Sequence, residues 1–233
     1  MEFISVKNVS KDYKKGSEVI HSLNGVSVDI KQGDFTIILG QSGSGKSTLL
    51  NLIGGMDCVT SGEIIVDGDN ISKKNKNQLT DYRRTDVGYV FQFYNLIPSL
   101  NVLENVRLAA RLSKSPISAE EAITAVGLKD RMKHFPSEMS GGEMQRVSIA
   151  RAICKNPKIL LCDEPTGALD SVTGEKIWIL LHKMATQYKK TVIAVTHNAL
   201  VAPAADRVIQ IKDGKIISVQ DNENPVALEK VAW

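Results

Sequence analysis

The sequence lacks any apolar run long enough to cross a membrane. A membrane-spanning helix needs roughly 20 consecutive apolar residues, whereas the cleanest runs here, such as Phe35–Leu39 and 191–195, are only as long as a strand. The first residues also lack a basic segment followed by an apolar core, so they do not have the pattern of a secretory signal peptide. We therefore expect a cytoplasmic protein that reaches a membrane only through a partner.

Neither sign of charge predominates, and cysteine is scarce. The formal net charge is +3 over 233 residues, so the strong basic surplus typical of nucleic-acid-binding proteins is missing, and we expect no nucleic-acid partner. The three cysteines, Cys58, Cys154 and Cys162, are odd in number, and their spacing matches no metal motif. Cys162 lies in an apolar run, where we expect a small buried side chain.

The apolar pattern changes along the chain and predicts two kinds of sheet. In the segment 26–30, apolar residues alternate with polar ones, which is typical of a half-buried antiparallel strand. Three later runs are apolar almost throughout, which favours parallel strands covered on both faces by helices. These runs are Phe35–Leu39, 159–162 and 192–195. We expect an α/β core preceded by an antiparallel β subdomain.

Five helices are predicted, and two of them lie in a segment of different character. They span 45–53, 101–112, 119–126, 142–154 and 174–188. The segment 93–139 separates two parts of the α/β pattern and reads as mostly helical, so we expect it to be an inserted helical subdomain.

Three further segments carry turn or loop signals. The lysine-rich run 73–77 is predicted to be a solvated loop. The segment 207–219 is predicted to be a hairpin that turns at Asp213-Gly214. The polar tail 221–233 is predicted to be a loosely held extension, with a docked Trp233 as the alternative.

The strongest local motif is a glycine-rich loop between an apolar run and a predicted helix. It fits the pattern G-x-x-x-x-G-K-[ST]. Its residues are Gly40, Gln41, Ser42, Gly43, Ser44, Gly45, Lys46, Ser47 and Thr48. The backbone N–H groups of such a loop and the following helix N-terminus form an anion site suited to a triphosphate. We expect Lys46 to reach the β- and γ-phosphates and the Ser47 hydroxyl to bind Mg²⁺.

Two carboxylates follow the apolar run 159–162. Asp163 and Glu164 would lie at the carboxyl end of a strand, where open α/β sheets bind ligands. With the phosphate loop nearby, Asp163 is expected to hold the magnesium ion. Glu164 is then placed to orient and deprotonate the attacking water.

The remaining motifs resemble those of ABC ATPases. The segment Ser140-Gly141-Gly142-Glu143-Met144-Gln145-Arg146 resembles the signature sequence of that family. Other matches follow in the family's order over nearly the whole chain. They are Tyr13 as the aromatic that stacks on adenine, Gln92 as the Q-loop glutamine, Asp170 in the D-loop, and His197 as the switch histidine. For Tyr13, a purely structural tyrosine is the alternative.

The resemblance implies a P-loop NTPase fold with a RecA-like mixed-sheet core. A single domain over 1–233 would divide into the core with its antiparallel β subdomain, at 1–92 and 150–219, a helical subdomain at 93–149, and a tail at 220–233. ATP and Mg²⁺ are the implied substrate and metal. Gln92 would contact the metal and sense a membrane partner, and His197 would contact the γ-phosphate.

The resemblance further implies a homodimer. Two copies would face each other head to tail, and each ATP would lie between the loop 40–48 of one copy and the signature of the other. The nucleotide-contacting signature residues would be Ser140, Gly141, Gly142 and Glu143, and Asp170 is grouped with them.

The signature departs from the usual Leu-Ser-Gly-Gly-Gln at two positions, Met139 and Glu143. Glu143 adds a negative charge that would repel a nearby phosphate. Ser140 and Glu143 also fit a helix capping box, and we expect the carboxylate to turn back toward the cap or toward the ribose.

The stretch 93–100 is rich in apolar and aromatic residues for a loop. It is either ordinary core of the helical subdomain or a groove for a short cytoplasmic helix of a membrane permease. Several segments resemble the macrolide-exporter, lipoprotein-release and bacitracin-resistance branch, such as 54–57, 96–98 and 101–106.

This branch implies an ATPase subunit at the cytoplasmic face of the membrane that powers export or extraction of peptides, lipoproteins or antibiotics. The alternative is a non-transporting ATPase that signals through a membrane protein to cell-wall enzymes. A soluble ABC ATPase acting on DNA or ribosomes is disfavoured, because no coiled-coil insertion or second nucleotide domain is present.

Overall fold

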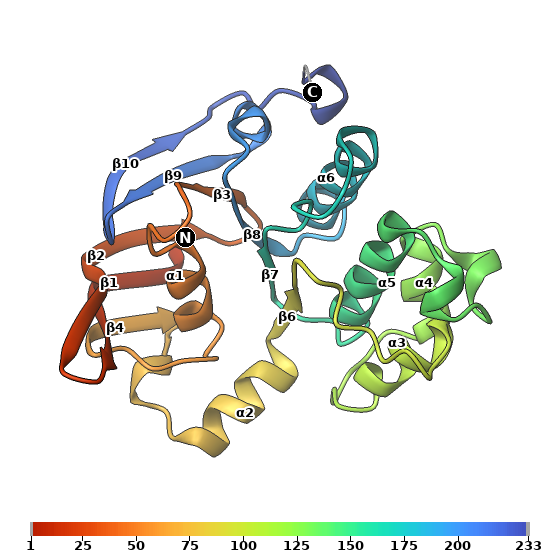
Figure 1. The fold of residues 1–233 in the computed structure, drawn as a ribbon, viewed down its shortest axis with the longest axis horizontal. Helices are drawn as coiled ribbons and strands as arrows, with labels where there is room; N and C mark the ends of the chain where they lie inside the picture. The colour runs from red at the N-terminus through yellow and green to blue at the C-terminus, as the bar shows by residue number, and fades with distance from the viewer. Residues whose placement is uncertain (1, 232–233) are drawn as a thin grey trace.

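The computed structural model describes residues 2–231 as two sheets, a helix between them and a separate group of helices (Figure 1). Ala232 and Trp233, and with them the predicted alternative of a docked Trp233, lie outside the described residues. The strands are β1 (Glu2–Lys15), β2 (Glu18–Lys31), β3 (Phe35–Leu39), β4 (Ser61–Val66), β5 (Asp69–Asn70), β6 (Val87–Val90), β7 (Ile159–Asp163), β8 (Thr191–Thr196), β9 (Arg207–Lys212) and β10 (Lys215–Asp221). The α-helices are α1 (Lys46–Ile53), α2 (Lys76–Thr85), α3 (Val102–Ala110), α4 (Ala119–Ala125), α5 (Gly141–Ile153) and α6 (Ser171–Thr186). Short 3₁₀ helices are η1 (Ile71–Lys73), η2 (Lys129–Arg131), η3 (Pro136–Glu138), η4 (Ala199–Ala204) and η5 (Leu228–Lys230).

The N-terminal sheet is antiparallel, as predicted. Its order is β2-β1-β4-β5, and β1 pairs with both β2 and β4. One face is buried and the other is exposed, which explains the alternating sequence of β2. The buried face looks toward α1 and the second sheet.

The second sheet is the mixed core sheet. Its order is β10-β9-β3-β8-β7-β6, and the strands from β9 to β6 run parallel, while β10 is antiparallel to β9. All residues of β3 and β8 are buried, in accordance with the apolar runs. The hairpin predicted at Asp213-Gly214 is the β9–β10 connection.

Helices cover both faces of the core sheet. On one face, α1 buries Leu49, Leu50 and Ile53 between the two sheets. On the other face, α6 packs its Trp178 edge-on against Phe35 of β3, with ring centroids 6.4 Å apart. The glycine-rich loop leads from the buried strand β3 into α1, so a buried element fixes each end of the loop.

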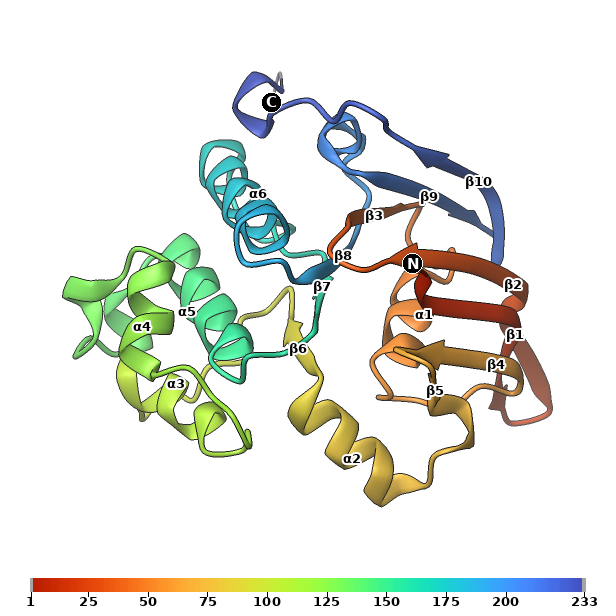
Figure 2. The same ribbon diagram turned by 180° about the vertical axis from the view of Figure 1, so that it is seen from behind.

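The helices α3, α4 and α5 form a group beside the β6 end of the core sheet (Figure 2). Capping boxes start all three, at Asn101, Ser118 and Ser140; each satisfies backbone donors that the first helical turn leaves free. Because α5 continues to Ile153, the predicted subdomain boundary at residue 149 falls inside this helix.

Two predictions about loops were wrong. The run 73–77 is not a loop throughout, because Asn75 and Gln78 form a capping box and α2 begins at Lys76. The tail is not loosely held up to residue 231. Leu228 is buried against α6, and Val226 donates its backbone N–H to the Pro203 carbonyl. Within residues 2–231, no helix combines the length and the apolar character that a membrane span requires.

Candidate functional site

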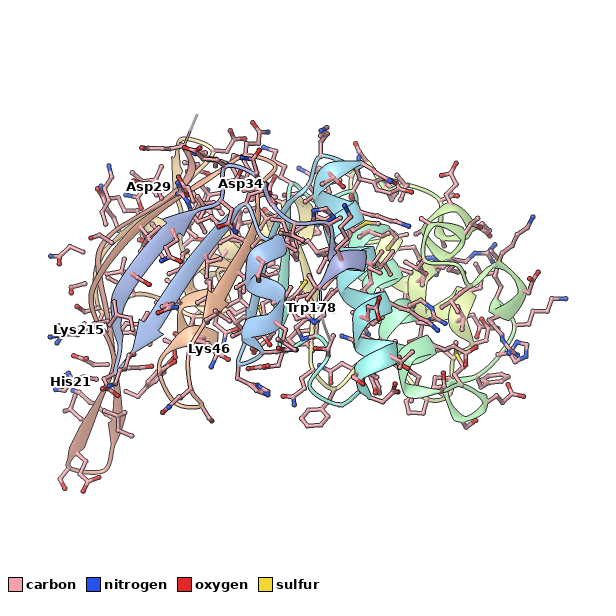
Figure 3. All side chains as sticks on the ribbon, turned by 90° about the horizontal axis from the view of Figure 1, so that it is seen from above. His21, Asp29, Asp34, Lys46, Trp178 and Lys215 are labelled. Carbon is pink, nitrogen blue, oxygen red and sulfur yellow. The ribbon has the colours of Figure 1, made fainter. Side chains whose placement is uncertain are left out.

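A cavity of about 600 Å³ lies where the carboxyl ends of β3, β7 and β8 meet the start of α1. Ligands bind at this edge in open α/β sheets. Figure 3 shows Lys46 near one end of the core strands, with Asp29 and Asp34 near the opposite end. The cavity is lined by Ser22, Ser42, Gly43, Gly45, Lys46, Ser47, Thr48, Gln92, Asp163, Glu164 and His197.

The loop that precedes α1 can be built only with glycine at two positions. Gly45 has a φ of 103°, and a Cβ there would lie 2.6 Å from the Ser22 carbonyl oxygen. A Cβ on Gly40 would lie 2.3 Å from the Ile211 carbonyl oxygen. The loop therefore wraps closely against its neighbours and opens the N-terminus of α1 toward the cavity.

Lys46 places a buried cation at this cavity. Lys46 is only 5% exposed, and its Nζ donates to the carbonyls of Gly40 and Gln41 at 2.8 and 2.9 Å. The same Nζ lies 3.9 Å from Glu164 Oε1. A cation held by two loop carbonyls is well placed to move onto a polyanion.

Ser47 and Asp163 form the oxygen-rich side of the cavity. The Ser47 hydroxyl donates to Asp163 Oδ1 at 2.8 Å, although 116 residues separate them in sequence. Mg²⁺ prefers hard oxygen ligands and commonly takes one or two from the protein, with phosphates and water completing its shell. The hydroxyl and the carboxylate fit this requirement.

Burial raises the pKa of Asp163 above its ordinary value, and the hydrogen bond from Ser47 opposes this only partly. A carboxyl with a raised folded-state pKa stabilises the fold at low pH, and that contribution is lost as the pH rises through the raised pKa. At pH 7, therefore, ionised Asp163 destabilises the nucleotide-free protein.

We expect Asp163→Asn to raise the melting temperature of the nucleotide-free protein at pH 7, with a difference that narrows as the pH is lowered. Mg-ATP should then stabilise the variant less than the wild type, because the stabilisation that a ligand gives grows with the logarithm of its affinity. Thermal unfolding with and without Mg-ATP measures both effects, and exposed Asp130→Asn is the control. A nucleotide-free variant that melts at or below the wild-type temperature would contradict the account.

Glu164 and His197 contact each other in the lining of the cavity. His197 Nδ1 lies 3.1 Å from Glu164 Oε2, and the Glu164 N–H donates to the Val195 carbonyl, which ties this residue to β8. Glu164 has a φ of 45°, an uncommon conformation for a residue other than glycine. Gln92 also lines the cavity, beside Gly167, where a Cβ would lie 2.9 Å from its Nε2.

The signature segment does not line this cavity. Ser140 caps α5, and its N–H donates to Glu143 Oε2 at 2.9 Å, so the predicted capping box is confirmed. The two glycines allow close packing within the chain, since a Cβ on Gly141 would lie 2.7 Å from the Tyr94 hydroxyl and one on Gly142 would lie 2.2 Å from Thr173 Cγ2. Asp170 is also outside the cavity, where it caps α6 by accepting from the Thr173 N–H at 3.0 Å.

Tyr13 also lies outside the lining of the cavity. Its hydroxyl donates to Asp57 Oδ2 at 2.9 Å, and the Lys11 ammonium lies 4.8 Å from the centre of its ring. These contacts fit the structural alternative and leave the predicted adenine contact a proposal.

One lining residue was not predicted from the sequence. This residue is Ser22, which belongs to β2 and precedes the glycine-rich loop in sequence. Its hydroxyl lies 2.7 Å from Thr48 Oγ1. No motif surrounds Ser22, so only the packing of the two sheets could reveal it.

The family model for ABC transporters matches residues 23–167. The chain belongs to the ABC transporter family. It is an ATP-hydrolysing cassette of that family, and its α/β fold with an antiparallel subdomain is that of the family's solved cassettes.

Three similar proteins illustrate this relationship. An ABC transporter ATP-binding protein of Mycoplasma pneumoniae is 46% identical over 99% of this cassette and 50% of its own length. The macrolide export ATP-binding/permease protein MacB of Mannheimia succiniciproducens is 44% identical over 93% of the cassette and 34% of its own length. A dimeric structure of the cassette MJ0796 from Methanocaldococcus jannaschii, in a post-hydrolysis state with ADP and Pi, superposes with a TM-score of 0.86 at 43% identity, over 95% of this chain and 99% of that one. The cassette spans about half the length of the first Mycoplasma relatives.

Proposed function

We propose that this cassette binds and hydrolyses Mg-ATP between two copies of itself and so powers a membrane permease that exports or extracts peptides, lipoproteins or antibiotics. The main support for this proposal is that a buried lysine, a serine–aspartate pair and a glutamate–histidine pair all line one cavity. Each pair joins segments that are remote in sequence, which supports a site rather than a chance glycine-rich turn.

The triphosphate lies along the loop 40–48 in this proposal. Backbone N–H groups of the loop and the start of α1 attract its charge, and Lys46 exchanges its bonds to the loop carbonyls for bonds to the phosphates. Ser47 and Asp163 would hold a Mg²⁺ ion, which would neutralise phosphate charge, and Gln92, two residues after the end of β6, would be a further contact. Tyr13 stacks on the adenine.

Glu164 orients the attacking water and accepts its proton. Its Oε2 is already in contact with His197 Nδ1 at 3.1 Å, so the histidine can steady the carboxylate and also contact the γ-phosphate. The remaining catalytic groups are Gln92 and Lys46, and the charge of Lys46 faces the β- and γ-phosphates. Electrostatic stabilisation of this kind is strongest where water is excluded.

A second copy completes the site. Ser140, Gly141, Gly142, Glu143 and Asp170 do not line the cavity of their own chain, which supports their acting on the nucleotide of a partner copy. The dimeric structures of the similar cassette MJ0796 give further support. Loss of the γ-phosphate would remove the group that joins the two copies.

The permease contact is proposed at the stretch 93–100. Phe93 is 70% exposed and Ile97 is 38% exposed, whereas Leu96 packs against the core. This stretch follows Gln92 directly and touches the signature through Tyr94, so motion of a permease element here can reach both parts of the nucleotide site. The cassette would then lie at the cytoplasmic face of the membrane.

The cargo class rests on the similarity to MacB, which is an exporter by its name. The test is reconstitution of the tagged cassette with the membrane protein that co-purifies with it. Mg-ATP should drive a labelled macrolide, peptide or lipoprotein out of the vesicle bilayer, and the Glu164→Gln variant should not. Stimulated ATP turnover without movement of any of these cargoes would contradict the transport proposal.

Phe93→Glu should uncouple ATP hydrolysis from the permease. A charge on the exposed ring position opposes burial in an apolar contact, so the ratio of ATPase rates with and without the permease should fall to about one. Ile217→Glu is the matched control, because Ile217 is 59% exposed on β10. If Phe93→Glu keeps both permease binding and stimulation, this surface is not the contact.

A further inference from the structure

The signature of this chain carries a charge where the proposed partner nucleotide would approach. Glu143 lies in the first turn of α5, three residues after the serine that would meet the γ-phosphate of the other copy. Two like charges brought together in a dimer contact oppose association. A group that compensates the charge of Glu143 would therefore favour the closing of two copies on ATP.

Both oxygens of Glu143 are already engaged within the chain. Oε1 lies 3.1 Å from Arg131 Nε, and Oε2 accepts the Ser140 N–H at 2.9 Å. The backbone hydrogen bond from Ser140 lowers the pKa of Glu143, and the charges of Arg131 and Arg146 act in the same direction. The carboxylate is therefore ionised and turned back against its own helix.

Arg131 is itself held in place by a second contact. Its Nη1 lies 3.1 Å from His134 Nε2, and because a guanidinium can only donate, this ring nitrogen accepts. The backbone N–H of Arg131 donates to the Leu128 carbonyl at 2.9 Å. The backbone carbonyl of His134 accepts from the Val102 N–H at the start of α3. The guanidinium thus lies between His134 and Glu143, and the backbone around it is tied to the start of α3.

The Ser140 hydroxyl has only one hydrogen to give. In the isolated chain it donates to Glu143 Oε2 at 3.0 Å, whereas a phosphate from a second copy would need the same hydrogen. If Ser140 turns to the phosphate, Glu143 keeps the backbone N–H and the guanidinium. Arg131 then provides the contact that holds the carboxylate away from the phosphate.

We propose that Arg131 is a positioning residue that neutralises Glu143 and holds it back, so that Ser140 is free to meet the triphosphate of the second copy. This inference rests on the proposed two-copy site. It assigns a specific electrostatic partner to the glutamate that replaces the usual glutamine of the signature.

The test is charge rescue in the Glu164→Gln background, in which closed dimers should accumulate. Sedimentation measures the dimer dissociation constant with Mg-ATP for the parent, for Arg131→Met, and for Arg131→Met combined with Glu143→Gln. A C2 dimer contains the contact between Arg131 and Glu143 twice. Even a modest loss of binding free energy at each of the two sites should therefore weaken association about tenfold. The double variant should return to within about twofold of the parent, because no uncompensated charge remains.

Lys129→Met is the matched control, since Lys129 is an exposed cation in the same 3₁₀ turn and makes no ion pair with any residue from 2 to 231. Mg-ATP affinity of the monomer and thermal unfolding check that Arg131→Met keeps the cavity and the fold. Equal dimerisation of Arg131→Met and the parent overturns the inference. So does a loss that Glu143→Gln fails to rescue, which would assign Arg131 a merely structural role. If the parent itself does not dimerise with Mg-ATP, the two-copy function falls and this inference falls with it.

Discussion

Replacing Glu164 by glutamine is expected to lower ATP turnover by roughly 10²–10⁴-fold, which is the usual contribution of a general base. Glutamine has nearly the same shape and can keep a hydrogen bond to His197, whose Nδ1 lies 3.1 Å from the carboxylate. It cannot accept a proton from water. The affinity for ATP should therefore stay close to that of the wild type, because Lys46, Ser47 and Asp163 are unchanged.

Phosphate release and equilibrium ATP binding, measured on the same preparation, separate these two effects. Glu223→Gln is the matched control, since Glu223 is exposed and lies in the segment after β10. A Glu164→Gln variant that releases phosphate at more than about a tenth of the wild-type rate, outside the expected range for a lost general base, would remove Glu164 from the proposed role.

Replacing Lys46 by alanine is expected to weaken ATP binding by roughly tenfold to 150-fold. A hydrogen bond to a charged group contributes about 1.5–3 kcal/mol, and each 1.4 kcal/mol is a factor of about ten. The loss is large here because the side chain is only 6% exposed, so water cannot easily replace it. The two loop carbonyls at 2.8 and 2.9 Å also lose their donor.

Lys158→Ala provides the comparison for this variant. Lys158 is a half-exposed lysine that pairs with Asp67 at 2.7 Å on another face, and its removal should leave ATP affinity within about twofold, because exposed ion pairs contribute little. Fluorescent-nucleotide titration measures both variants. Unchanged affinity in Lys46→Ala would mean that the triphosphate lies elsewhere.

The parts of the fold that the sequence predicted are those with a strong local signal. The apolar runs that became β3, β7 and β8 are buried on both faces, and few other elements of an α/β fold have that pattern. The signature helix was predicted by its capping box, which the structure contains. The glycine-rich loop was predicted by its motif, and the structure shows that a Cβ on Gly40 or Gly45 would clash with neighbouring backbone.

The parts that were missed depend on contacts without a local pattern. The helix α2 buries only Leu79 and Tyr82, so its sequence reads as polar, and its capping box at Asn75 was the one signal overlooked. The tail docks through Leu228, one of a few apolar residues in an otherwise polar segment. Nothing in the sequence indicates that Arg131, rather than Lys129 or Lys133, contacts Glu143.

The central claim is that ATP lies between the phosphate loop of one copy and the signature of another. Cross-linking tests it most directly, in a Cys58→Ser, Glu164→Gln background, since Cys58 is the exposed cysteine among the three. Copies that carry Ser42→Cys are mixed with differently tagged copies that carry Ser137→Cys. Both serines are exposed, and Ser137 lies just before the signature. With a short bifunctional maleimide, a cross-linked pair should form with Mg-ATP and should be much weaker with ADP or without nucleotide. Cross-linking that is absent with Mg-ATP, or equal in all three conditions, would contradict the account.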